Sequence, residues 1–318
     1  MSKTPRRWTY SAASVMASVA LVLSLLPPLS APDIQLVLDA YETPVAPRQE
    51  PRRVFHLGHS LVGETMPAML EQLAPEGHDY ASQLGWGTSL REHWEPDLAV
   101  RGLDLDNPHH AFRPAREAVA SGAYDALVLT EMVEIKDAIR YHDSAKYTNM
   151  WADAARAANP TTTIYLYETW HHLNDQAGWL HRLDNDLVTQ WVGHLLYPDL
   201  QQAGTGRPIR LIPAGQVMAA VVRKIETAPV GGLSSREDFF ARSDSGKLDT
   251  IHVNDLGAYL VALTHYAVLY GRSPVGLPHK LRKANGKPAQ APTLEAARMM
   301  QETVWEVVTS LRMTGVAG

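Results

Sequence analysis

The chain has 318 residues, a net charge of −5 and no cysteine. Without cysteine it cannot form a disulfide, use a thiolate nucleophile or bind zinc through sulfur. Its 29 basic residues are scattered along the chain, so no basic stripe indicates nucleic acid as a partner. A chain of this length can bury one sizeable hydrophobic core.

Residues 1–31 have the pattern of an export signal. Arg6 and Arg7 form a basic start, an apolar stretch covers residues 12–26, and small residues near position 30 offer a cleavage point. The apolar stretch is short for a membrane span, which needs about 20 residues. We therefore expect a periplasmic or secreted protein. The alternative is an uncleaved N-terminal anchor, which would attach the protein to a membrane.

The rest of the chain predicts one domain of alternating strands and helices. Residues 32–52, rich in proline and charge, predict a linker or surface arm before a domain over residues 53–318. Apolar runs predict strands, and helical spacing predicts helices. The predicted strands are 54–57, 80–84, 124–130, 162–167 and 209–212, and the main predicted helices are 66–73, 114–120, 147–158, 216–225, 255–270 and 294–311.

Strands separated by helices favour right-handed βαβ units, and hence an α/β fold with a parallel five-stranded sheet covered on both faces. In such sheets ligands bind beyond the carboxyl ends of the strands. Residues 91–110 and 169–178 show no clear periodicity. We expect them to be irregular insertions at that rim of the sheet.

Two motifs far apart in the chain carry the residues of a nucleophilic site. The first reads GHSL at residues 58–61, after the first strand, and the second reads DTIH at residues 249–252. A serine hydroxyl becomes a useful nucleophile when an imidazole takes its proton and a carboxylate orients that imidazole. We therefore predict a triad of Ser60, His252 and Asp249. A helix-capping role is the competing interpretation of His252.

These motifs resemble the blocks of the SGNH, or GDSL-like, hydrolases, which are lipases and esterases on a flavodoxin-like three-layer α/β/α sandwich. GHSL stands where that family has its serine nucleophile, and DTIH stands where it has D-x-x-H; the likeness covers residues 54–270. A glycine-containing second block corresponds to residues 85–89. By this resemblance, the backbone N–H groups of Ser60 and Gly87 would bind the oxyanion, and no cofactor would be needed.

The third block departs from the family pattern. SGNH hydrolases have G-x-N-D after the third strand, where the asparagine donates to the oxyanion, whereas this chain reads TEMVE at residues 130–134. A carboxylate at Glu131 would repel the developing negative charge unless it is protonated or turned away. Thr130, Asn149 and Asn174 are the candidate replacement donors. The resemblance is therefore to a divergent branch of the superfamily.

Six further side chains near the rim are predicted to contact substrate: His59, Trp86, Arg91, Glu131, Trp170 and His171. Indole rings stack on sugar rings and acyl chains, but they also pack in cores. His59 can instead be a hydrogen-bonding support, and Arg91 can pair with Glu92 or Glu95 rather than with an anionic sugar. Since adjacent histidines point apart on a strand, His171 and its neighbour are expected to be polar loop or substrate-contact residues, and no metal site is predicted.

The sequence thus predicts an exported serine esterase that cleaves carboxylic esters through an acyl-enzyme. The favoured substrates are short-chain O-acetyl esters of carbohydrates. This choice rests on the export signal, on the tryptophans near the rim, and on the substrates that the resemblance to the family implies. The alternatives are a lipase or thioesterase with the same mechanism, a polysaccharide O-acetyltransferase, and a non-catalytic glycan-binding protein on a degenerate SGNH scaffold. The order of serine before D-x-x-H disfavours the transferase, and the missing asparagine motivates the binding protein.

Overall fold

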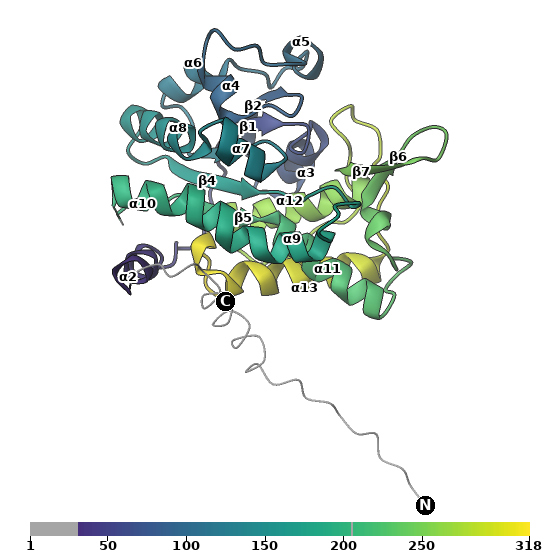
Figure 1. The fold of residues 1–318 in the computed structure, drawn as a ribbon. Coiled ribbons are helices and arrows are strands. Elements are labelled where there is room, and N and C mark those ends of the chain that lie inside the picture. Colours follow the sequence, from purple (N-terminus) through teal and green to yellow (C-terminus); the bar gives the residue numbers. More distant parts are fainter. Residues whose placement is uncertain (1–30, 205) are drawn as a thin grey trace, which may run out of the picture.

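The computed structural model describes residues 31–204 and 206–318. The export signal predicted for residues 1–31 therefore lies outside the described residues, apart from its last position. The predicted linker begins as a helix, α2 (Ala31–Ala40), which lies beside α10 (Tyr197–Ala203) in Figure 1. The hydroxyl of Tyr41, just after α2, donates to the carbonyl of Ile209 at 2.6 Å and fixes this segment to the domain.

Five parallel strands form the centre of the domain. They are β1 (Arg53–His59), β2 (Asp79–Gly85), β3 (Ala126–Leu129), β4 (Thr163–Glu168) and β5 (Arg210–Pro213). Their order is β2-β1-β3-β4-β5, which is the flavodoxin-like arrangement. In the register, Phe55 of β1 pairs with Ala81 on one side and with Leu127 on the other. The predicted α/β sandwich with five parallel strands is confirmed.

Alternate residues of the strands face two layers of helices, because side chains of a strand alternate between its faces. Residues such as Val54, Val128 and Tyr165 pack against one layer. That layer consists of α3 (Thr65–Leu73), α11 (Ala214–Thr227), α12 (Asp255–Tyr270) and α13 (Leu294–Ser310). Nearly every residue of α12 is buried, as its apolar sequence predicts for a helix enclosed on all sides.

The opposite face of the sheet presents residues such as Phe55, Leu127 and Leu166. They pack against α6 (Ala115–Ala120), α7 (Ile135–Tyr141), α8 (Ser144–Ala158) and the π-helical segment η1 (Leu187–Leu196). Figure 1 shows the sheet between these two layers. Among the helices of the described residues, none is long and apolar enough to cross a membrane.

The rim of the sheet is more regular than predicted. The first insertion contains α4 (Leu90–Trp94) and α5 (Leu103–Asp106), and after the second insertion α9 (Trp179–Asp186) runs directly into η1 and α10. That second helical stretch is not among the predicted elements, although apolar residues at 183, 187, 191 and 195 have helical spacing.

An antiparallel hairpin follows α11 and a short 3₁₀ turn, η2 (Arg236–Phe239), while η3 (Arg312–Thr314) follows α13. The hairpin consists of β6 (Phe240–Arg242) and β7 (Leu248–Val253), and Figure 1 shows it beyond the end of the sheet that lies away from α2. The DTIH motif lies in β7, a strand that was not predicted.

Candidate active site

Ser60 occupies the turn that directly follows β1. The strand approaches β3 closely before this turn, since a Cβ on Gly58 would lie 2.6 Å from the Cβ of Thr130. The Gly58 carbonyl accepts a hydrogen bond from Nε2 of His93 (2.8 Å), and the Gln83 side-chain amide donates to Nδ1 of the same ring (2.9 Å). Burial lowers the pKa of His93 to about 4, so this ring is neutral. The hydrogen bond from the buried His93 ring therefore helps to fix the turn that carries Ser60.

The imidazole and its carboxylate lie in β7. Oδ1 of Asp249 accepts from the backbone N–H groups of Ile251 (2.9 Å) and His252 (3.0 Å). Although partial burial opposes ionisation, these two N–H groups and the imidazole lower the pKa of Asp249 to about 2. The carboxyl group is therefore ionised at neutral pH. The buried indole of Trp170 donates to the Ile251 carbonyl (2.7 Å) and ties β7 to the end of β4.

The three predicted triad residues meet at one point. Oγ of Ser60 lies 3.0 Å from Nε2 of His252, and Nδ1 of His252 lies 2.8 Å from Oδ2 of Asp249. Because an ionised carboxylate only accepts, Nδ1 carries the proton and Nε2 is free to accept from the serine hydroxyl. The serine and the histidine are 192 positions apart in the chain, so only the fold brings them together. This is the geometry of a nucleophile, a general base and an orienting carboxylate.

An open cleft of about 440 Å³ lies over these groups, a size that suits a small ligand. Apolar side chains and a few polar groups line it, namely His59, Ser60, Leu61, Trp86, Gly87, Asp106, Val133, His172, Ile251 and His252. No lysine or arginine belongs to this lining in the described part of the chain. The cleft therefore has the mixed character of a site for a small, largely uncharged molecule.

Within residues 31–204 and 206–318 the backbone N–H groups of Ser60 and Gly87 have no acceptor, and among the cleft residues those of Val133 and His172 have none either. Gly87 has a left-handed φ of +56°, and no heavy atom lies within 4 Å of the position that a Cβ would take. The preceding residue, Trp86, donates its own N–H to the carbonyl of Arg101 at 2.7 Å and so anchors the turn. Free N–H groups beside a nucleophile are what an oxyanion requires.

Glu131 does not line the cleft, in contrast to the substrate contact predicted for it. Its fully buried carboxyl group accepts from the backbone N–H groups of Met132 (2.8 Å) and Leu90 (3.2 Å). Burial raises the pKa of Glu131 to about 7, against the opposing effect of these hydrogen bonds. The side chain is thus turned away from the oxyanion position, and its carbonyl accepts from Nε2 of His59 at 2.8 Å. Thr130, Asn149 and Asn174 are also absent from the cleft lining.

Arg91, Trp170 and His171 also lie outside the cleft, so the predicted substrate contacts of these three side chains are not found. Arg91 lies 3.7 Å from Asp143 rather than pairing with either predicted glutamate. Trp170 is only 1% exposed and acts on the cleft through β7. His171 is buried, whereas His172 lines the cleft, so the adjacent histidines point apart as predicted.

His59 and Trp86 do line the cleft. Burial lowers the pKa of His59 to about 4, partly offset by its bond to the Glu131 carbonyl, so it presents a neutral ring beside the nucleophile. Of the other polar lining residues, Asp106 was not predicted as a site residue, and His172 was predicted only as a polar loop or substrate-contact residue. His172 is fixed by a contact of 2.9 Å between its Nδ1 and Oγ1 of Thr250. In the sequence, only its position next to His171 indicated that His172 could lie at the site. Asp106 gave no such indication, because it lies on α5, a single helical turn in a stretch without periodicity.

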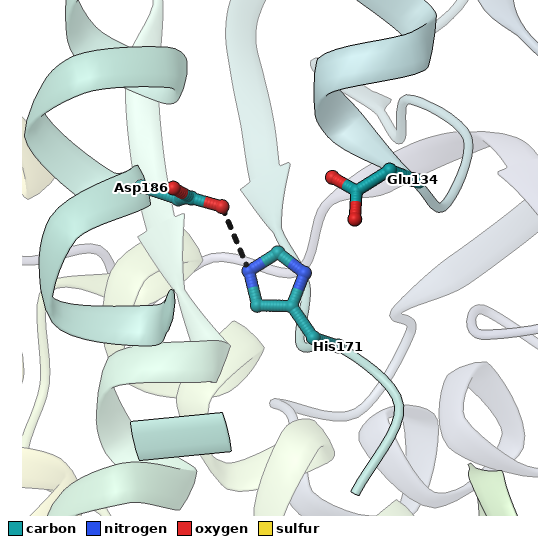
Figure 2. A group of neighbouring side chains, drawn as sticks. All are labelled: Glu134, His171 and Asp186. Carbon is teal, nitrogen blue, oxygen red and sulfur yellow. Dashed lines mark ion pairs between the residues drawn. The ribbon is translucent and has the colours of Figure 1, made fainter. Parts of the chain in front are cut away.

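Next to the cleft, Glu134, His171 and Asp186 bring ligand-type atoms within 4.8 Å of one another (Figure 2). The guanidinium of Arg182 already supplies the positive charge of this cluster, because it lies 2.6 Å from Glu134, 2.6 Å from Asp175 and 2.7 Å from Asp186. Burial works against each charge, yet the hydrogen bonds to Arg182 lower the pKa of Glu134 and raise that of Arg182, and those from His171 and Arg182 lower the pKa of Asp186. The cluster is an internal salt-bridge network.

No protein-family model matches the chain, and no curated protein matches it. Among solved structures, it is similar to a DUF4886 family protein from Bacteroides uniformis, with 14% identity, a TM-score of 0.48, and coverage of 81% of this chain and 95% of that one. It is also similar to a carbohydrate esterase family 3 protein from Talaromyces cellulolyticus, with 18% identity, a TM-score of 0.36, and coverage of 68% and 95%.

A family 3 carbohydrate esterase from Clostridium thermocellum is a third similar structure, with 13% identity, a TM-score of 0.36, and coverage of 68% of this chain and 94% of that one. At such identities these likenesses concern the fold. The chemistry of the site follows from the geometry of its own cleft.

Proposed function

We propose that the protein is a serine esterase that hydrolyses carboxylic esters in this cleft. The observation that carries the proposal is the relay of contacts from Ser60 through His252 to Asp249, at 3.0 Å and 2.8 Å. The same cleft includes Ser60 and Gly87, whose backbone N–H groups have no acceptor among the described residues. Together these groups supply a nucleophile, a base and oxyanion donors.

The reaction begins when Oγ of Ser60 attacks the ester carbonyl carbon while its proton passes to Nε2 of His252. The carbonyl oxygen becomes an oxyanion, which the two backbone N–H groups stabilise. As the tetrahedral intermediate collapses, the bond to the alkoxy oxygen breaks, and His252 returns its proton to the leaving alcohol. Water then attacks the acyl-enzyme, gives its proton to His252, and releases the carboxylic acid when Ser60 is reprotonated. Asp249 stays ionised throughout and stabilises the imidazolium.

Within this class we propose that the substrate carries a short acyl group, such as acetyl, on a carbohydrate. The cleft of about 440 Å³ is open and short of the apolar groove that a long acyl chain needs, since its clearly aliphatic lining residues are Leu61, Val133 and Ile251. An exposed indole, that of Trp86, offers a stacking surface of the kind that sugar rings use. We further propose that the enzyme acts after export, as the N-terminal pattern predicts.

The test is hydrolysis of p-nitrophenyl esters by the purified protein and by a Ser60→Ala variant. We expect the wild-type protein to cleave the acetyl ester and the variant to lose at least about a thousandfold in kcat, because Ser60 is the only residue of the described chain with a hydroxyl in contact with Nε2 of His252. A series from acetyl to palmitoyl should show falling kcat/KM with chain length. Wild-type activity in Ser60→Ala would refute the nucleophile, and a maximum at palmitoyl would favour a lipase.

A further inference from the structure

Trp86 is held in one orientation at the mouth of the cleft. Its side chain is 48% exposed, yet its indole N–H donates to Oδ1 of Asp106 at 2.9 Å and its backbone N–H donates to the Arg101 carbonyl at 2.7 Å. A large aromatic side chain that is both exposed and anchored loses little further entropy when a ligand stacks on it. The ring is therefore a preformed surface directly before the oxyanion residue Gly87.

Gly102 makes this orientation possible. A Cβ at Gly102 would lie 2.5 Å from both Cδ1 and Nε1 of Trp86, so the indole lies directly against the glycine backbone. Gly102 also has a left-handed φ of +72° and begins α5, where its carbonyl accepts from the N–H of Asp106 at 2.9 Å. The glycine thus positions the ring and the carboxylate together. It does so without a side chain of its own that could touch a ligand.

Asp106 supplies the only carboxylate of the cleft lining within the described residues. Its Oδ1 accepts from the indole, while its Oδ2 makes no hydrogen bond or ion pair within the described residues. An ionised carboxylate oxygen at a cleft is a strong acceptor for a ligand hydroxyl. It also repels an anionic ligand, and no lysine or arginine of the lining offsets that repulsion.

We propose that Trp86 and Asp106 form a subsite for an uncharged sugar ring, which stacks on the indole and donates a hydroxyl group to Oδ2 of Asp106. This inference rests on the proposed function, because the subsite would hold the ring that carries the ester beside Ser60. It goes further because it assigns a substrate preference to these two residues. The enzyme accepts neutral glycans and rejects glycans that carry a carboxylate on the ring bound at Trp86. Arg91, for which binding of an anionic sugar was one of two interpretations, lies outside the cleft.

The experiment compares three substrates: an acetylated neutral xylo-oligosaccharide, the same oligosaccharide bearing glucuronic acid, and p-nitrophenyl acetate, which has no sugar. In Trp86→Ala we expect kcat/KM for the neutral oligosaccharide to fall about tenfold more than for p-nitrophenyl acetate, with a smaller difference in Trp86→Phe, which keeps a stacking ring. Gly102→Ala should behave like Trp86→Ala, because it displaces the indole without removing it.

Asp106→Asn keeps an acceptor for the indole but removes the charge. We expect this variant to lose most of the wild-type preference for the neutral oligosaccharide over the glucuronic acid form. Titration of the unacetylated oligosaccharide into Ser60→Ala, with and without Trp86→Ala, measures binding apart from turnover, and thermal melting of each variant reports folding.

Two results overturn the subsite: equal loss on all three substrates in Trp86→Ala, or no wild-type preference for the neutral glycan. If Ser60-dependent cleavage of p-nitrophenyl acetate persists in either case, the esterase proposal stands and only the subsite is refuted. Ser60→Ala cleaving p-nitrophenyl acetate at the wild-type rate would instead refute the esterase.

Discussion

At the scale of single residues, the ionisation of Asp249 decides how the site works. Two backbone N–H groups and the imidazole hold this carboxylate in its charged form, and the charge in turn selects the His252 tautomer that accepts from Ser60. The carboxylate therefore acts on the nucleophile only through the imidazole. Replacing Asp249 with asparagine, an amide of the same size, separates the effect of its negative charge from the effect of its shape.

We predict that Asp249→Asn lowers kcat for p-nitrophenyl acetate by about a thousandfold or more and leaves KM within a few fold. An amide can donate to Nδ1, which favours the wrong tautomer and places a proton on the Nε2 that should accept from Ser60; in another serine hydrolase this change costs about 10⁴-fold. Steady-state kinetics measure the effect. Retention of more than a tenth of the wild-type kcat would show that Asp249 does not orient the base.

Glu131 illustrates at the same scale why sequence position alone misleads. A carboxylate at the place of an oxyanion donor predicted repulsion unless the group is protonated or turned away, and Glu131 was also named as a substrate contact. The structure shows the turned-away arrangement, in which the carboxyl group is buried and accepts from the N–H groups of Met132 and Leu90. The direction of a side chain depends on its neighbours in the fold, and one of these neighbours, Leu90, lies 41 positions away in the chain.

At the scale of elements, the salt-bridge network of Arg182 joins the segments that carry the cleft. Arg182 lies in α9, Glu134 is the N-cap residue of α7, and Asp175 lies in the loop after β4. Val133 and His172, which line the cleft, are next to members of this network, Glu134 and His171. The network therefore positions two walls of the cleft without touching the ligand.

We predict that Arg182→Met destabilises the protein by about 3 kcal/mol, because it removes the guanidinium partner of the buried Asp186 and of the partly buried Glu134 and Asp175, and leaves Asp186 with only Lys136 at 3.5 Å as a cationic partner among the described residues. The matched control is Arg223→Met, which removes the exposed ion pair with Asp184 and should cost less than about 1 kcal/mol. Chemical denaturation of both variants measures the difference. Equal stabilities would mean that the network contributes no more than a surface pair.

The strands and most helices were predictable because hydrophobic spacing and chain connectivity carry their signal. Two residues just after the DTIH motif fix the start of α12: Asn254 caps this helix, and a Cβ at Gly257 would lie 2.6 Å from the Phe239 carbonyl oxygen. The β6–β7 hairpin and α5 were missed because short elements with little burial have weak periodicity. Asp106 was missed with them, since its place at the cleft depends on α5.

At the scale of the whole molecule, buried titratable groups determine how stability varies with pH. Burial lowers the pKa values of His59, His78, His93 and His265 to about 4 from an ordinary value of 6.5, and it lowers the pKa of His56 well below 6.5. Between these limits the unfolded chain binds more protons than the folded protein, so the free energy of unfolding falls as the pH drops from 6.5 towards 4.

Two buried carboxyl groups act in the opposite direction. Burial raises the pKa of Glu131 to about 7 and that of Glu168 to about 8, from an ordinary value of 4.5. The folded protein then binds more protons than the unfolded chain between 4.5 and these values, so the free energy of unfolding falls as the pH rises through them. Below pH 6.5 the effect of the five histidines on the free energy of unfolding exceeds that of the two carboxyl groups, so stability falls as the pH drops.

We therefore predict maximum stability near pH 6.5, with a steep decline on the acid side and a shallower one up to about pH 8. Thermal melting across pH 4–9 tests this prediction. Glu131→Gln, which keeps the acceptor oxygen, removes a group that takes up a proton on folding between pH 4.5 and about 7, so it should steepen the acid decline below pH 6.5 and flatten the start of the alkaline decline. A stability that rises steadily from pH 6.5 to 8, or that is flat from pH 6.5 to 4, would contradict the assignment.

The central claim is that Ser60 is a nucleophile activated by His252, and covalent labelling tests it most directly. A fluorophosphonate reacts with an activated serine, and peptide mass spectrometry locates the adduct. We predict one adduct per chain, on Ser60, and labelling at least about a hundredfold slower in His252→Ala, which loses the acceptor for the serine proton. An unlabelled wild-type protein, or an adduct that forms as readily in Ser60→Ala, would contradict the account.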